Sequence, residues 1–171
     1  MGIRSTLPAL TCAAILAMTL SAAAVAGDAA DAADADGGNA VAAVHTSTEP
    51  YEVVRDNVRF AIVGKGLIVS ANLHIQDMLE RTAATLESPA GVFAHAESIE
   101  FCSALLSHEM VGAHPSNVTL CPFTIAVYVL AAEPETVYVA YRRPVLAGAE
   151  AGDAQARVEG FLDDIVQEAL F

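Results

Sequence analysis

The sequence predicts a single α+β domain over residues 40–171, with a mostly antiparallel sheet of about five strands and helices packed against it. Two β-prone runs, 123–131 and 136–142, are separated only by a short turn that contains Pro134, which favours an antiparallel hairpin. Apolar residues recur at helical spacing over 153–170, which predicts an amphipathic C-terminal helix packed across the sheet. The glycine-rich phosphate loop of a parallel, doubly wound sheet does not occur in the sequence.

The remaining elements follow from local patterns of the same kind. Residues 41–46 suit a short strand, which stops at the turn before Pro50. An amphipathic helix is predicted next, and glycines at 64 and 66 end it. Its apolar face consists of Tyr51, Val54, Val58, Ala61 and Ile62. Further along, we expect strands at 67–73 and 98–102 and helices at 75–84 and 103–111. The helix at 103–111 is expected to have Ala104, Leu105, His108 and Val111 along one side.

The N-terminal residues have the pattern of a secretory signal peptide. Arg4 precedes an apolar stretch over 7–26 that ends in the small residues Ala-Val-Ala, which signal peptidase requires. We therefore expect residues 1–26 to be removed by cleavage near Ala26 and the protein to be periplasmic or secreted. Residues 27–39 contain Asp, Ala and Gly but no large apolar side chain, so they are predicted to be a disordered acidic leader.

The composition is strongly acidic. The chain has 21 Asp and Glu residues against 8 Lys and Arg residues, which gives a formal net charge of −13. Such a chain repels nucleic acid and anionic lipid surfaces, so we expect neither as a partner. After the signal peptide, no apolar run reaches the ~20 residues that cross a bilayer, so we expect no membrane span in the mature protein.

Two cysteines remain after the signal peptide, which contains Cys12, is removed. Cys102 and Cys121 form an even pair in an oxidising compartment, so a disulfide between them is the first hypothesis. Two unpaired buried cysteines, or a ligand or redox role, are the alternatives. Cys102 directly precedes the helix predicted at 103–111, where unpaired N–H groups and the helix dipole lower the pKa of a thiol. That position favours a reactive cysteine.

Side chains that could hold a ligand gather in the same part of the sequence. Cys102, His108, His114 and Cys121 are the residue types that bind a transition metal or a b-type haem, and we predict a ligand site where they meet.

A second candidate site is the adjacent basic pair Arg142 and Arg143, because guanidinium groups bind anionic ligands or acidic side chains. The sequence has neither a Gly-x-Ser-x-Gly elbow nor a His-Glu-x-x-His motif, so we predict no catalytic residue.

Several segments together resemble a known family. They are SIEFC at 98–102, LLSHEM at 105–110, LCP at 120–122, IAVY at 125–128, VYVAY at 137–141 and Pro144. This pattern is similar to the domain-of-unknown-function family number 302, over residues 46–144. The resemblance implies a compact fold similar to the TATA-box-binding-protein-like sheet with packed helices, often seen as a homodimer, and it implies no established activity. The helix at 153–170 lies outside the matched part, where it could be an added packing or dimerisation element.

Three functions remain open from the sequence. The leading hypothesis is an exported periplasmic accessory or ligand-binding protein, homodimeric rather than monomeric and a binding protein rather than an enzyme. The first alternative is a thiol-dependent redox enzyme that uses Cys102. The second is a structural module that acts only through protein–protein contacts.

Overall fold

A computed structural model describes residues 41–86, 91–149 and 151–171 of the chain. All of these residues belong to one compact unit. The predicted signal peptide, 1–26, and the predicted acidic leader, 27–39, lie outside the described residues. Within the described part of the chain, no helix is both long and apolar enough to cross a membrane.

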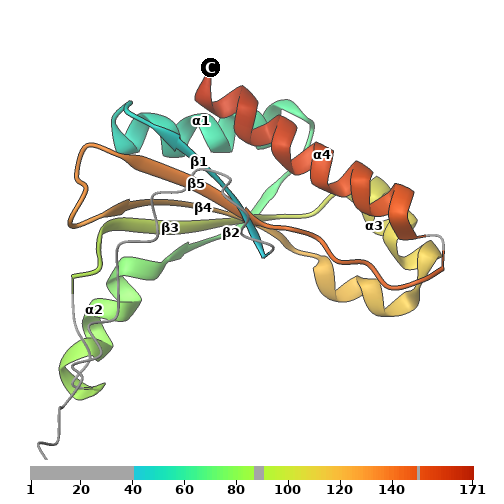
Figure 1. Cartoon of the computed structure of the whole chain (residues 1–171), viewed down its shortest axis with the longest axis horizontal. Helices are drawn as coiled ribbons and strands as arrows, with labels where there is room; N and C mark the ends of the chain where they lie inside the picture. Colours follow the sequence, from blue (N-terminus) through green and yellow to red (C-terminus); the bar gives the residue numbers. More distant parts are fainter. Residues whose placement is uncertain (1–40, 87–90, 150) are drawn as a thin grey trace, which may run out of the picture. The chain divides into compact units, whose positions relative to one another are not determined.

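The described residues form one five-stranded sheet in which every neighbouring pair of strands is antiparallel (Figure 1). The strand order is β1-β5-β4-β3-β2. The strands are β1 Ala42–Ser47, β2 Val69–His74, β3 Phe93–Phe101, β4 Phe123–Leu130 and β5 Val137–Arg142. The helices are α1 Tyr51–Gly64, α2 Ile75–Leu86, α3 Ala104–Ala113, the 3₁₀ helix η1 Pro115–Leu120, and α4 Ala151–Leu170. The predicted α+β class and antiparallel sheet are confirmed.

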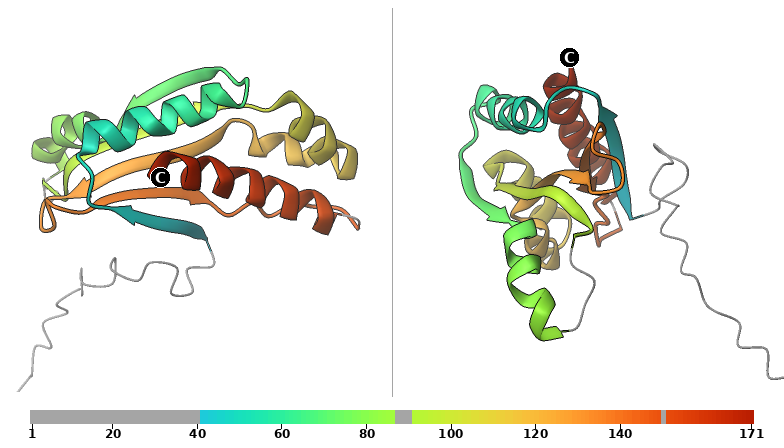
Figure 2. Two further views of the ribbon diagram at one scale, coloured as in Figure 1. Left: turned by 90° about the horizontal axis from the view of Figure 1, so that it is seen from above. Right: turned by 90° about the vertical axis from the view of Figure 1, so that its left-hand side faces the viewer.

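Helices α1 and α4 lie side by side on one face of the sheet (Figure 2). All five apolar positions predicted for α1 are buried, because helical spacing places them on the face toward the sheet. The stripe of α4 is buried in the same way, with Val158, Ile165 and Val166 fully inaccessible to solvent. β4 alternates buried and half-buried residues, and its buried residues complete this core. The apolar face of α4 therefore packs against its own chain.

Two details of the predicted elements are wrong. β3 begins at Phe93, five residues before the predicted start at Ser98. In α3, the buried residues are Leu106 and Met110, whereas Leu105 is 71% exposed, so the predicted apolar side was the wrong one. The reason is that apolar residues occur on more than one side of this short helix, so the spacing alone does not select the face toward the core.

The early part of β3 carries a polar cluster under α1. Glu97, whose side chain is only 11% exposed, accepts a hydrogen bond from Asn72 Nδ2 at 2.6 Å. Arg55 and Arg59 of α1 approach the same carboxylate at 3.7 and 3.4 Å. Burial, followed by the Glu97 charge, raises the pKa of Tyr51. The cluster provides the partners that a buried carboxylate requires at this position.

Candidate functional site

The two cysteines are joined by a disulfide. β3 and β4 pair in an antiparallel register that places Phe101 opposite Phe123. The residues just beyond this pair therefore lie close together, and the Cα atoms of Cys102 and Cys121 are 5.8 Å apart. Of the alternatives left open by the sequence, the structure selects the disulfide.

The predicted Cys/His ligand site does not form. Sulfur atoms within a disulfide offer no thiolate to a metal, so Cys102 and Cys121 are not ligands in this state. His108 is exposed on α3. The imidazole of His114 caps η1 instead: its Nδ1 accepts a hydrogen bond from the Ser116 amide at 3.2 Å. Across the part of the chain that the structure describes, no group of three or more His, Cys, Asp or Glu side chains is arranged to hold a metal ion.

The cysteine pairing also affects the redox hypothesis. Cys102 does precede α3, as predicted, and Ser103 forms the N-cap by accepting a hydrogen bond from the Leu106 amide at 3.4 Å. In the disulfide, however, Cys102 has no free thiol. A redox role would therefore require this bond to open.

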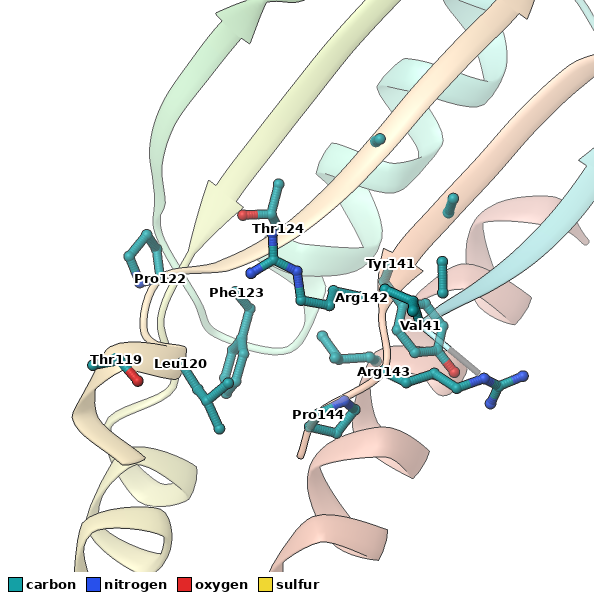
Figure 3. Close-up of a pocket in the computed structure, with 14 residues that line it drawn as sticks. Val41, Thr119, Leu120, Pro122, Phe123, Thr124, Tyr141, Arg142, Arg143 and Pro144 are labelled. Carbon is teal, nitrogen blue, oxygen red and sulfur yellow. The ribbon is translucent and has the colours of Figure 1, made fainter. Parts of the chain in front are cut away.

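The two arginines of the basic pair point in different directions. Arg143 forms an ion pair with Glu159 of α4, and its amide donates to the Val41 carbonyl at 2.8 Å. Arg142 is exposed and forms no ion pair with any described residue. In Figure 3 its side chain reaches toward Thr124 of β4, whereas the side chain of Arg143 extends away from it. Of these two arginines, Arg142 is therefore the one that forms no ion pair with a described residue.

Arg142 lies at a pocket that opens where β4 and β5 separate. The ladder between these strands ends at the pair Ile125 and Tyr141. Beyond this pair, β5 continues to Arg142 beside β1, whereas β4 extends to Phe123 beside β3. Pro122 precedes β4, where its missing N–H costs no ladder hydrogen bond. The divergence of the two strands leaves a cavity of ≈ 330 Å³, which we call the strand-end pocket.

The strand-end pocket is mainly apolar and is lined by residues from β1, β4, β5, η1 and α4 and the adjoining segments (Figure 3). The apolar lining residues are Val41, Ala42, Leu120, Pro122, Phe123, Ala126, Ala140, Pro144 and Leu162. The polar lining residues are Thr119, Thr124, Tyr141, Arg142 and Arg143. Ala126 and Ala140 are directly paired across β4 and β5, and their small side chains leave room for a ligand.

Two structural features hold the η1 wall of the pocket in place. The disulfide is one, because Cys121 stands between the lining residues Leu120 and Pro122. The other is Asn117, which is 3% exposed. Its amide nitrogen donates to the Met110 and Ala147 carbonyls, both at 2.9 Å, and its amide oxygen accepts from the Ala147 amide at 2.8 Å. These bonds tie η1 both to α3 and to the segment that follows β5.

A glycine allows this close packing. Gly148 has a φ of 117°, and a Cβ built there would lie 2.6 Å from the Ala113 carbonyl oxygen. Only glycine fits this position, one residue beyond the hydrogen bonds of Asn117. Sequence reasoning missed the anchoring role of Asn117, because its buried partners come from distant segments.

Comparisons with known proteins identify the fold. The structure is similar to the crystal structure of an uncharacterized conserved DUF302 protein from Bacillus stearothermophilus, with a TM-score of 0.59 and 12% sequence identity. The similarity covers 75% of this chain and 97% of that chain. No curated protein matches the sequence.

The sequence model of the family described as "Domain of unknown function DUF302" matches residues 43–169. This range is wider than the 46–144 inferred from sequence motifs, and it includes most of α4. The helix that the motifs left outside the family is therefore part of its common domain. The chain belongs to the DUF302 family.

Proposed function

We propose that this protein is an exported binding protein that holds a small, mainly apolar molecule in the strand-end pocket. The observation that carries the proposal is the cavity of ≈ 330 Å³, lined by nine apolar residues and a few polar ones. Ligand pockets typically have volumes of about 300–1,000 Å³ and combine an apolar lining with a few polar groups that orient the ligand. The two anchors of η1 favour a preformed site.

Export is supported by the signal-peptide pattern of residues 1–26 and by the disulfide, which is typical of an oxidising compartment. We expect protein purified from the periplasm to start at Gly27 and to be two hydrogens lighter than its fully reduced form. Intact mass spectrometry before and after reduction measures both. A chain that keeps its first residues, or two free thiols, would contradict this part of the proposal. Homodimer formation stays a prediction from the family resemblance.

Filling the pocket should abolish ligand binding. In the variant Ala140→Leu, the larger side chain fills part of the pocket, because Ala140 lines the pocket and is paired with Ala126, which also lines it. We expect the neutral fluorescent probe phenylnaphthylamine to bind wild-type protein and to bind this variant at least about tenfold more weakly, a loss of about 1.4 kcal/mol. Fluorescence titration gives both dissociation constants.

The matched control is Ala132→Leu, which adds the same side chain at an exposed position in the β4–β5 turn. This variant should bind the probe as the wild type does, and thermal unfolding should show that both variants are folded. The proposal is wrong if neither the neutral probe nor its sulfonated derivative binds wild-type protein. Equal affinity of wild type and Ala140→Leu would place the ligand elsewhere and would also overturn it.

A further inference from the structure

We infer that the ligand of the strand-end pocket is an organic anion, whose apolar body fills the cavity while its acidic group binds Arg142. This inference rests on the proposed function and adds the chemical class of the ligand. Its motive is the guanidinium of Arg142, which has no ion-pair partner among the described residues and lines a mainly apolar cavity.

The placement of Arg142 follows from the register of the sheet. Arg142 ends β5 opposite Ala42 of β1, on the sheet face that also carries Ala140. The neighbouring Arg143 follows β5 and also lines the pocket, but it forms an ion pair with Glu159 of α4. One arginine of the pair thus fixes the segment after β5 to α4, and the other is left at the pocket.

Acidic side chains could compete for Arg142, but the geometry does not pair them. The register places Glu100 of β3 on the same face, opposite Thr124 of β4, and so one strand farther from Arg142. No ion pair joins Glu100 to Arg142. A ligand anion seated beside Thr124 would therefore meet the guanidinium without displacing a carboxylate.

The chemistry of the guanidinium selects the class of ligand. Arg presents a planar fork of N–H donors that matches the paired oxygens of a carboxylate, phosphate or sulfonate. The formal charge of −13 opposes the approach of any anion, so an anion that binds must have a specific local partner. The cavity supplies burial for an apolar body, and Arg142 supplies that partner.

Two probes that share one apolar body separate these contributions. Phenylnaphthylamine is neutral, and anilinonaphthalene sulfonate is the same skeleton with a sulfonate group. We expect the sulfonate probe to bind wild-type protein about tenfold more tightly than the neutral probe, and Arg142→Gln to remove this preference. Arg81→Gln is the matched control, because Arg81 is an exposed arginine on α2, away from the pocket. Arg81→Gln should leave the affinity for both probes as it is in the wild type.

Each result is decisive. The inference that the ligand is an anion would be overturned if wild-type protein bound both probes with equal affinity. It would also be overturned if Arg142→Gln left the affinity for the sulfonate probe unchanged. In either case the proposed pocket would still stand, provided that Ala140→Leu blocks binding of the neutral probe. A preference that Arg81→Gln removes as well would show a general charge effect and would also overturn the inference. If neither probe binds, both this inference and the proposed function fail.

Discussion

Replacing Ile165 by alanine should lower the free energy of unfolding by about 2–5 kcal/mol. Ile165 lies in the middle of the apolar stripe of α4, is 0% exposed and belongs to the main core cluster. The substitution removes buried methyl and methylene groups and leaves a cavity that packed neighbours fill only in part. Urea denaturation followed by circular dichroism measures the loss, with the midpoint shifting and the slope unchanged.

The adjacent residue provides the control. Asp164 is exposed on the same turn of α4, so Asp164→Ala changes the helix without opening the core. We expect this variant to stay within about 0.5 kcal/mol of the wild type, because exposed substitutions away from specific contacts have small effects. If the two variants were equally stable, α4 would not be the integral core helix that the buried stripe and the family match indicate.

The elements that the sequence predicted best are those whose signal is local and strictly periodic. In α1 the predicted apolar face is the buried face, residue for residue. The predicted strands at 123–131 and 136–142 differ from β4 and β5 by only one residue at one end of each. In such segments the spacing of apolar residues sets both the element type and the face toward the core, so no knowledge of the rest of the chain is needed.

The first half of β3 shows where this reasoning stops. His95 and Glu97 are polar, yet both face α1, so the alternation typical of a half-buried strand is hidden. The ring of His95 stacks on Tyr51 at 4.6 Å between centroids, and Glu97 is held by Asn72 and two arginines. These partners come from other elements. Their positions exist only in the folded chain, which is why the sequence predicted a shorter strand.

The candidate site was predictable only in part for a similar reason. The sequence predicted Arg142 and Arg143 together as an anion-binding pair, whereas in the structure Arg143 forms an ion pair with Glu159 of α4. The pocket beside it exists because β4 and β5 diverge beyond Ile125 and Tyr141, a property of strand pairing that no local pattern encodes. Closeness along the chain does not by itself make side chains converge, and among the described residues no three His, Cys, Asp or Glu side chains are arranged to hold a metal ion.

Removing the disulfide should reduce both stability and ligand binding. The bond links residues 19 positions apart, and the loop it closes contains α3 and η1. By the chain-entropy estimate, opening a loop of this length costs about 3 kcal/mol. The double variant Cys102→Ser, Cys121→Ser removes the bond without leaving a reactive thiol. Urea denaturation of this variant and of the wild type, each with and without a dithiol reductant, measures the loss.

The comparison under reductant separates the bond from the substitutions. Wild-type protein reduced by a dithiol should fall to the stability of the double variant, whereas the variant itself should not respond to the reductant.

Loss of the disulfide should also weaken ligand binding. Because Cys121 lies between the lining residues Leu120 and Pro122, the η1 wall of the pocket should become less well positioned in the double variant. The pocket probes should then bind this variant more weakly than the wild type at temperatures where the variant is folded. Unchanged affinity would show that Asn117 alone holds this wall, since its three hydrogen bonds to Met110 and Ala147 do not depend on the disulfide. Unchanged stability would contradict the prediction, because the expected loss arises from the loop closure that the bond imposes on the unfolded chain.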